Sequence, residues 1–429
     1  KLLILLQFEK LTLVGYGQPR NMKILFVTEY YYPYIHGGAE ISVFQLAKKL
    51  RAVVLTPKYG QITDLGDVVV ERFPWPVKLR EFSSQLSPVF FANPITWLYL
   101  TIIIIWKNQK IKADIFHCQS VNSFPGVWLA SKILGKKTVL SIRDNQILCN
   151  YGWCLSKNNG KACNFKDYFI DDFRQYYKDK VKNKNVITLI INILFAINGR
   201  LRCSILKFFA NLADEKICGS YSQQETLSIN GISANVIYNI FEFTKPVVNK
   251  YPKKIVLYAT KLSSGKGLDL LLHSWVKVNQ VLPNFKLKII GNGDASFYEN
   301  LANKLDISKT IVISPRMGYQ NIQKIRQSVF LEVTPSIYPE SFGRTTLEAI
   351  ALGVPVIATN RGGLKEIVED GVTGYVVDPD EKQLSDAIIK GINNNKKLRR
   401  NIITEYLSLK RKFETEPVKK YLDLYRKLI

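Results

Sequence analysis

Short apolar runs alternate with helical segments along both halves of this chain, and this alternation constrains the fold more than any other feature. The runs are rich in Val and Ile without polar alternation, which is typical of parallel strands covered on both faces. We expect strands at 23–28, 52–56, 68–73, 114–118, 138–142, 215–218, 235–238, 255–258, 286–290, 310–313 and 329–333. We expect helices at 39–50, 95–108, 127–134, 268–281 and 296–305. The pattern predicts an α/β protein with two doubly wound domains that face a central cleft.

The length of 429 residues is sufficient for two domains that each bury a core. We place the first domain at 22–245 and the second at 250–405, with linker residues near 239–252. Residues 1–21 are interpreted as an N-terminal extension outside the fold, because the first strand run begins only after them. Residues 406–429 end a charged helical tail and are expected to form a last helix.

The formal net charge of +25 predicts anionic partners, for which nucleic acid, a phospholipid surface and phosphorylated substrates are the alternatives. The sequence carries no zinc finger, RNA-binding signature or arginine-rich arm, and its lysines are spread along the chain. An anionic membrane surface or a phosphorylated substrate is therefore favoured over nucleic acid.

Two apolar stretches, 95–106 and 186–197, are each about a dozen residues long. A membrane-spanning helix needs about 20 such residues, so we expect both stretches to be core helices. The alternative is that they lie on a membrane surface, which basic flanking residues would assist. These flanking residues are Lys107, Lys110, Lys112, Lys182, Lys184 and Arg200.

Three of the six cysteines, Cys149, Cys154 and Cys163, lie in a segment at 145–185 that fits no strand–helix unit. They include no C-x-x-C pair and have no nearby histidine, so ordinary reduced thiols are expected and a zinc site stays an alternative. Long loops in compact domains often carry function. We expect this segment to face an acceptor or a membrane, unless it is an insertion without a catalytic part.

Two glutamates, Glu340 and Glu348, stand eight residues apart around a glycine that opens a short helix. We expect the helix at about 344–352, ended by Gly353 and followed by an apolar strand at 354–359. Backbone N–H groups at a helix start favour an anion, phosphate above all. Glu340 is placed to accept hydrogen bonds from the hydroxyls of a bound group, and Glu348 to reach a ribose. A lone glutamate is usually a solvated surface acid, but its neighbours here favour a site.

Those neighbours resemble a known family signature. The sequence after the second glutamate continues with Gly353-Val354-Pro355-Val356-Ile357, Gly362-Gly363, Glu366-Ile367-Val368 and Gly371-Val372-Thr373-Gly374. With the two glutamates, this block of about forty residues resembles the signature of retaining GT-B glycosyltransferases of the family 4 type, the glycosyl transferases group 1. The resemblance covers about residues 22–400 and is strongest in the second half.

The resemblance implies a GT-B fold of two Rossmann-like domains. The first domain would take the acceptor and the second the nucleotide sugar, and the last helix would pack back on the first domain. It also implies which residues bind the donor: Gly37, Gly38, Lys261, Lys266, Gly291, Arg316, Met317, Glu340, Ser341, Phe342, Gly343, Arg344, Thr345 and Glu348.

Catalytic roles are implied for three of these residues. Lys261 and Lys266 would grip the donor diphosphate, because breaking the sugar–phosphate bond builds charge on the leaving phosphate that fixed cations stabilise. Glu340 would bind the transferred sugar. The family has Gly-Arg where this chain has Thr260 and Lys261, and a lysine lacks the bidentate fork of arginine, so we expect weaker orientation of the diphosphate.

The acceptor-side candidates are Arg143, Asp144 and His117. Arg143 stands where many relatives have a histidine. Its pKa is too high for a base, so it is expected to bind a phosphate if it acts at all. His117, at another strand end, is interpreted preferentially as a structural imidazole. Asn239 matches an Asn-Gly turn of the family, but Ile240 replaces its glycine.

The implied activity is transfer of a sugar from a nucleotide diphosphate sugar to an acceptor hydroxyl with retention of configuration. No metal and no cofactor beyond the co-substrate are implied, because the lysines and the helix start supply the positive charge. The resemblance and the positive charge together imply a role in polysaccharide or glycolipid assembly. The acceptor would be lipid-linked or a saccharide, and the protein would act at the cytoplasmic membrane face. Two alternatives stay open. One is a GT-B-like protein that binds a nucleotide sugar without turnover, and the other is a nucleic-acid-binding protein.

Overall fold

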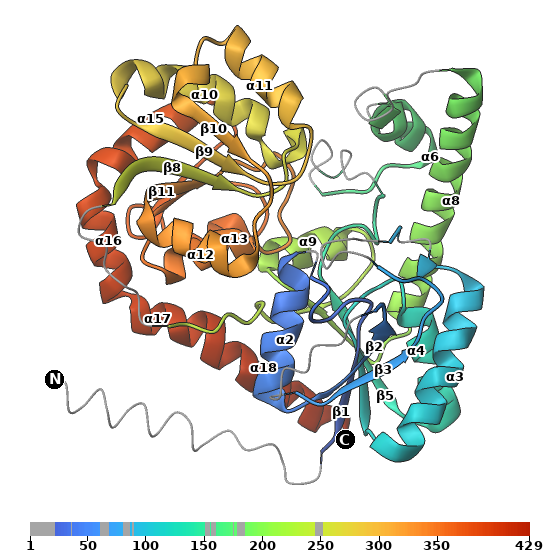
Figure 1. Cartoon of the computed structure of the whole chain (residues 1–429). Helices are drawn as coiled ribbons and strands as arrows, with labels where there is room; N and C mark the ends of the chain where they lie inside the picture. The colour runs from blue at the N-terminus through green and yellow to red at the C-terminus, as the bar shows by residue number, and fades with distance from the viewer. Residues whose placement is uncertain are drawn as a thin grey trace, which may run out of the picture.

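The computed structural model describes residues 22–35, 37–60, 68–79, 86–87, 90–150, 155, 160–174, 176–177, 185–244 and 252–429. Within them the chain forms two parallel sheets with helices packed on them, one sheet in each half of the molecule (Figure 1). The extension expected at 1–21 and the central residues of the expected linker, 245–251, lie outside the described residues.

The N-terminal sheet has seven strands in the order β3-β2-β1-β4-β5-β6-β7, and all neighbouring strands are parallel. Its central strands are buried runs, as their composition predicts. The strands are β1 (Ile24–Val27), β2 (Val53–Lys58), β3 (Val70–Pro74), β4 (Ile115–Cys118), β5 (Lys137–Ile142), β6 (Glu215–Cys218) and β7 (Asn235–Val236). The helices include α2 (Gly38–Leu50), α3 (Pro94–Ile111), α4 (Phe124–Leu134), α8 (Val186–Asn211) and α9 (Tyr221–Ile229).

The C-terminal sheet has six strands in the order β10-β9-β8-β11-β12-β13, again all parallel. The strands are β8 (Lys253–Ala259), β9 (Lys286–Ile290), β10 (Ile311–Ser314), β11 (Val329–Thr334), β12 (Val356–Thr359) and β13 (Gly374–Val377). The helices are α10 (Leu268–Val281), α11 (Ala295–Lys304), α12 (Tyr319–Ser328), α13 (Arg344–Ala351), α14 (Leu364–Ile367) and α15 (Glu381–Asn393).

The strand order reverses once in each sheet, between β1 and β4 in the first and between β8 and β11 in the second. At such a reversal the connections leave toward opposite faces, which opens a crevice beyond the carboxyl ends of the two central strands. Ligands of open α/β sheets bind in this crevice. The fold therefore offers one candidate crevice in each domain.

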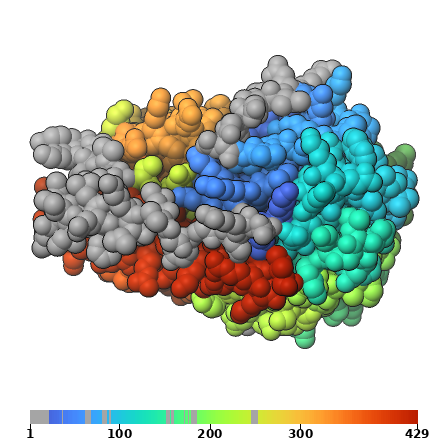
Figure 2. Space-filling view, turned by 90° about the horizontal axis from the view of Figure 1, so that it is seen from below, coloured from blue at the N-terminus to red at the C-terminus, as the bar shows by residue number. Residues whose placement is uncertain are grey.

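The chain returns to the N-terminal domain at its end. After α16 (Asn395–Thr404) and α17 (Tyr406–Lys410), a π-helical turn (Arg411–Thr415) leads into α18 (Glu416–Leu428). Tyr421 and Tyr425 of α18 share a buried cluster with Phe26 of β1 and Leu46 of α2. Figure 2 shows this red segment running across one face of the molecule toward the blue and cyan N-terminal domain. The last helix thus ties the two domains together.

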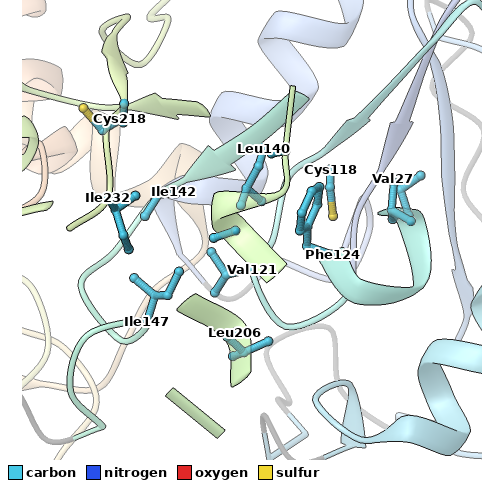
Figure 3. Packing of buried hydrophobic residues seen from close by; sticks show 14 of the residues in the cluster. Val27, Cys118, Val121, Phe124, Leu140, Ile142, Ile147, Leu206, Cys218 and Ile232 are labelled. Atoms are coloured by element: carbon cyan, nitrogen blue, oxygen red, sulfur yellow. The ribbon is translucent and has the colours of Figure 1, made fainter. Parts of the chain in front are cut away.

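The main core of the N-terminal domain lies between the sheet and helices α3, α4 and α8. Figure 3 shows Val27, Cys118 and Leu140, from three neighbouring strands, near Phe124 of α4 and Leu206 of α8. Because the fully buried side chains of α8 begin only at Ala196, the N-terminal part of that helix extends beyond this core (Figure 1).

Helix α8 corrects one expectation. The stretch at 186–197 is not a core helix, because most of its apolar side chains are exposed, among them Ile187 (70%), Ile190 (53%) and Leu194 (60%). It is the first half of a 26-residue helix, and it alone among the described helices is long and apolar enough to cross a membrane. Only 22% of its most apolar window is buried. Helix α3 is intermediate, with one face in the core and the other exposed.

The segment at 145–185 contains, where it is described, a short α6 (Phe165–Asp167) and a π-helical turn (Tyr168–Phe173). It forms no strand–helix unit in these parts, as expected. Helices α9 and α12 and strand β13 were not anticipated, because α12 carries few apolar residues and β13 is only four residues long.

Candidate active site

An ion pair occupies the crevice of the C-terminal domain. Lys266 ends a short 3₁₀ turn after β8, and Glu340 lies in the loop after β11, so the two flank the point of strand reversal. The Lys266 Nζ donates to Oε1 of Glu340 at 2.5 Å, and Ser336 Oγ donates to the same oxygen. Burial acts to raise the pKa of the Glu340 carboxyl, but the Lys266 ammonium and the two hydrogen bonds outweigh it and lower the pKa.

The backbone holds the two loops in register. The carbonyl of Gly265 accepts hydrogen bonds from the N–H groups of Ile337 and Tyr338, at 3.0 and 3.1 Å. The loops that carry Lys266 and Glu340 are therefore joined by backbone hydrogen bonds close to the ion pair. Preorganisation of this kind places a charge without a cost of reorientation when a ligand binds.

Gly343 sets the start of α13. Its φ of 101° lies in the left-handed region, and a Cβ there would come within 2.6 Å of Leu364. The next residue begins the helix, as expected from the sequence, so the first-turn N–H groups of α13 begin four residues beyond Glu340. Phe342 is buried beside Tyr238 and Phe413, which anchors this loop.

Glu348 lies in a buried cluster of alternating charges. Its carboxylate accepts from Arg344 Nε at 2.9 Å, and also from Arg326 Nη1 and Gln323. Arg326 in turn forms a two-point contact with Glu332, at 2.8 and 3.1 Å. Burial alone would lower the pKa of Arg326, but attraction to the two carboxylates raises it. The predicted ribose contact of Glu348 stays a prediction; in this structure its oxygens bind arginine and glutamine.

Arg344 joins the two domains. Its Nη1 donates to Ser42 Oγ of α2 at 2.6 Å and to the carbonyl of Ile240 at 3.2 Å, and its Nη2 donates to Gln45 at 3.2 Å. Together with Glu348 these contacts bury the guanidinium, which is 8% exposed. Its predicted donor role stays untested, and its observed contacts are between domains.

The glycine loop of the N-terminal domain faces this same region. The Gly37 N–H donates to Glu40 at 2.8 Å, and the Cα of Gly38 lies so close to Arg344 that a Cβ would come within 2.4 Å of its side chain. From the other side, Arg316 donates to the carbonyl of Ile35 at 3.2 Å. The structure therefore brings the predicted donor residues of the two domains together.

The remaining predicted donor residues surround the ends of β8 and β9. Lys261 is exposed after β8. Gly291, after β9, approaches the Thr260 carbonyl so closely that a Cβ would lie 1.9 Å from that oxygen. Met317 packs against the core beneath α13, and Thr345 is half-buried in the first turn of α13. These positions line one edge of the C-terminal sheet.

A second pocket, with about 130 Å³ of free space, lies in the crevice of the N-terminal domain. Its walls come from the segments after β1, β4 and β5, and include Arg143, Asp144 and Gln119. Arg143 donates to Gln119 Oε1 at 2.5 Å and to Asn239 Oδ1 at 2.8 Å. Arg143 Nε and Gln119 Nε2 are buried donors without a hydrogen-bond partner among the described residues. Both atoms are buried, so a ligand in this pocket would reach them only after the side chains of Arg143 and Gln119 move.

Glu29 is a pocket residue that the sequence reasoning missed. It is 9% exposed and accepts hydrogen bonds from Ser120 and, at 2.9 Å, from Ser123. Burial raises the pKa of its carboxyl to about 7, against the effect of these hydrogen bonds. Its position just beyond the end of β1 was the available signal, since side chains there meet the crevice. Ser336, just beyond β11, was missed in the same way.

His117 lies in the core rather than in the pocket. It is fully buried, and its ring nitrogens contact Tyr425 Oη at 2.6 Å and Ser141 Oγ at 2.8 Å. Burial, together with the charge of Arg143, holds its pKa well below the usual value. The neutral ring thereby connects α18 to the N-terminal sheet.

The two pockets are neighbours across the domain boundary. Ser341 Oγ donates to the carbonyl of Arg143 at 2.7 Å, and Ser220 Oγ donates to the carbonyl of Ser341 at 2.7 Å. The loop that carries Glu340 thus touches the strand end that carries Arg143. A ligand in one crevice would lie beside a ligand in the other.

Comparisons with known proteins agree with this architecture. Residues 240–406 match the family model described as Glycosyl transferases group 1. Over 376 residues the chain is 27% identical to an uncharacterized glycosyltransferase of Methanocaldococcus jannaschii, covering 83% of this chain and 85% of that protein. Over 149 residues it is 31% identical to the lipopolysaccharide 1,2-N-acetylglucosaminetransferase of Salmonella typhimurium, covering 32% of this chain and 38% of that protein.

Solved structures are similar over nearly the whole chain. Anabaena HepE in complex with UDP and glucose superposes with a TM-score of 0.66 at 18% identity, covering 95% of this chain and all of that one. Sucrose-phosphate synthase of Thermosynechococcus elongatus superposes with a TM-score of 0.68 at 17% identity, covering 95% and 99%. The fold is therefore GT-B, with two Rossmann-like domains. Residues 240–406 thus match the group 1 glycosyltransferase model, and most of the chain is similar to an uncharacterized glycosyltransferase.

Proposed function

We propose that this protein is a retaining glycosyltransferase that uses a nucleoside diphosphate sugar as donor. The observation that carries the proposal is the Lys266–Glu340 pair at the strand reversal of the C-terminal sheet, beside the start of α13. It lies within the region that matches the glycosyltransferase family. A cation and a helix start suit a diphosphate, and a carboxylate held ionised suits the hydroxyls of a sugar.

In the proposed reaction the bond between the anomeric carbon and the diphosphate oxygen breaks. A new bond forms from the acceptor oxygen to the same face of that carbon, and the acceptor proton passes to the departing phosphate oxygen. Lys266, with Lys261 and the N–H groups of α13, stabilises the charge that develops on the diphosphate. These groups supply positive charge at the phosphates, so the proposed mechanism assigns no step to a metal ion.

The acceptor is proposed to enter the N-terminal pocket. Arg143 and Gln119 there present buried N–H donors, and Asp144 and Glu40 also line the wall. The contact between Ser341 and Arg143 places this pocket beside the donor crevice. Such a pocket fits an acceptor with hydroxyl groups and an anionic group, as in a saccharide linked to a lipid phosphate.

We further propose that the protein lies on the cytoplasmic face of a membrane through the side formed by α3, α4 and α8. Large apolar side chains are exposed on all three helices, which lie on one side of the N-terminal domain (Figure 1). They include Ile95, Leu98, Ile102, Trp106, Ile133, Ile190, Leu194, Phe195 and Leu201. A net charge of +25 would add attraction to anionic lipids. Because the second half of α8 is fixed in the core, the helix is proposed to lie on the surface rather than to cross it.

The decisive experiment is a transfer assay with a panel of nucleoside diphosphate sugars and lipid-linked acceptors. We expect one donor to release its nucleoside diphosphate, and the product to keep the donor's anomeric configuration by NMR. The variant Glu340→Gln should lose most of this activity, whereas Lys277→Met, which breaks an exposed ion pair with Asp386, should not. An inverted product would disprove retention. Donor binding without release would favour the binding-only alternative, and binding of nucleic acid instead would favour the other one.

A further inference from the structure

A buried cluster of two thiols and a carboxylate lies outside the proposed active site. The Sγ atoms of Cys149 and Cys163 and an oxygen of Asp172 all lie within 4.8 Å of one another. The Asp172 Oδ2 is 2.6 Å from the first sulfur and 3.8 Å from the second. The side chains are 2%, 2% and 0% exposed, so the cluster is closed to bulk water. Among the described residues, no other set of three such ligand groups comes this close.

These atoms suit a metal ion of the zinc type. Thiolates select soft or borderline cations, and zinc forms bonds of about 2.3 Å to sulfur and about 2.0–2.2 Å to carboxylate oxygen. In a tetrahedral site these bond lengths put neighbouring ligand atoms about 3.6 Å apart. The separation of 3.8 Å already suits one ion, and the separation of 2.6 Å requires the side chains of Cys149 and Asp172 to move apart by about 1 Å. Cys154, the third cysteine of this sequence cluster, lies outside the described residues.

The surroundings favour a negatively charged ligand set. Two thiolates and one carboxylate around a divalent ion leave a net charge of about −1. Arg200 of α8 donates to the carbonyl of Cys163 at 3.0 Å, and its guanidinium lies over the ring of Tyr168. Arg202, two residues further along, donates to Asn150, next to Cys149. Two guanidinium groups are thus held beside the cluster, where they balance its charge.

The three ligands come from three separate pieces of the 145–185 segment. Cys149 follows the loop after β5, Cys163 precedes α6, and Asp172 lies in the π-helical turn. Tyr168, in the same turn, donates to the carbonyl of Ala196 on α8 at 3.1 Å. An ion at the cluster would therefore join the three pieces of the segment to one another. The contact of Tyr168 with Ala196 would then hold the joined segment against α8.

We propose that Cys149, Cys163 and Asp172 bind a structural zinc ion that holds this segment against the N-terminal domain. Binding releases the two thiol protons to solvent and leaves each sulfur as a thiolate. The site takes no part in the proposed sugar transfer, and the proposal does not depend on that function.

The test measures metal on the full-length wild-type protein after dialysis against metal-free buffer. Elemental analysis should find about one zinc ion per chain, as a structural site requires. Replacement by Co²⁺ should give a thiolate-to-cobalt charge-transfer band in the near ultraviolet. Cys149→Ser and Cys163→Ser should each lose both signals, and Asp172→Asn should weaken retention by about 10- to 100-fold. The matched control Cys218→Ser removes a buried thiol on β6, outside this segment, and should keep both.

A strong chelator should lower the thermal midpoint of the wild-type protein, and added Zn²⁺ should restore it. This measurement does not depend on whether a cysteine variant folds. Wild-type protein without bound metal and without a cobalt band would overturn the proposal. So would a disulfide between Cys149 and Cys163 in the intact protein, detected by mass spectrometry, or zinc that persists in both serine variants.

Discussion

Lys266 and Glu340, 74 residues apart in sequence, form an ion pair of 2.5 Å at the point where the strand order of the C-terminal sheet reverses. The carbonyl of Gly265 accepts hydrogen bonds from the loop that carries Glu340, so the backbone fixes the two loops relative to each other. In the proposed function, Lys266 binds the donor diphosphate, and Glu340, whose pKa the lysine lowers, binds the sugar.

Removal of Lys266 should change how stability depends on pH. In the wild type the lowered pKa of Glu340 contributes stability above the carboxyl's ordinary pKa, and this contribution is lost as pH falls through the folded-state value. In Lys266→Met burial is opposed only by the hydrogen bond from Ser336, so the pKa of Glu340 should rise, and the variant should be destabilised at neutral pH but approach the wild type as pH falls. Thermal midpoints between pH 3 and pH 7, conditions chosen to span the carboxyl range, will show this. Unshifted curves, equal to those of the surface control Lys277→Met, would contradict it.

Arg344 should be a stability residue as well as a site residue. Arg344→Met leaves Glu348 with one buried ionic partner fewer and removes the hydrogen bonds to Ser42 and Gln45. Breaking a buried pair costs about 3–5 kcal/mol, so the free energy of unfolding should fall by about that amount in urea titrations. The exposed Arg400→Met serves as control and should change it by less than about 0.5 kcal/mol. A small effect of Arg344→Met would show that the domain contact is weak.

Because of Glu29, the wild-type protein should be more stable in mild acid than above neutral pH. Its folded-state pKa of about 7 lies above the usual carboxyl value, so its contribution is full below the ordinary pKa and is lost as pH rises through about 7. The loss is on the order of 3 kcal/mol, at about 1.4 kcal/mol per pKa unit. Glu29→Gln should remove this dependence and be more stable than wild type at pH 8, where wild-type Glu29 is ionised. Parallel stability curves for the two proteins between pH 5 and pH 8 would refute the assignment.

Helix α8 should carry membrane affinity. Ile190→Glu and Leu194→Glu place charges on exposed positions, so the fold should persist by circular dichroism. Sedimentation with vesicles that contain anionic lipid should fall by at least about tenfold in the double variant, because two apolar contacts are replaced by repulsive charges. Phe297→Glu, on the exposed face of α11 in the other domain, is the matched control. Equal loss in both variants would mean that net charge, not this helix, governs binding.

The fold could be predicted largely from local pattern. Apolar strand runs and the turn at Gly343 are decided by nearby residues, and every observed strand except β13 lies within a few residues of an expected one. The α8 prediction was wrong for a nonlocal reason. Whether an apolar helix is buried depends on what packs over it, and the polar residues after Ile197 also hid its true length.

The residues of the candidate site also fall into two groups, those that a local pattern identifies and those whose surroundings come from distant parts of the sequence. Glu340 and Gly343 were predicted from the distinctive spacing within one block, and Lys266 from a separate resemblance to the family in the loop after β8. Glu29 could not be identified as a buried acid, because its burial arises from β4 and β5, which are distant in sequence. Asp172 was missed as a partner of Cys149 and Cys163 because a π-helical turn, not a recognisable spacing, brings it to them.

Calorimetric titration of the wild-type protein and Lys266→Met with a panel of nucleoside diphosphate sugars tests the central claim most directly. Zinc is left in the buffer, so the cysteine cluster is unaffected, and Lys277→Met is the control. The account predicts that one donor binds the wild type with micromolar affinity, and that the Lys266 variant binds it about 10- to 100-fold more weakly, the worth of a charged hydrogen bond. Equal affinity in the two proteins, or no binding by any donor, would contradict it.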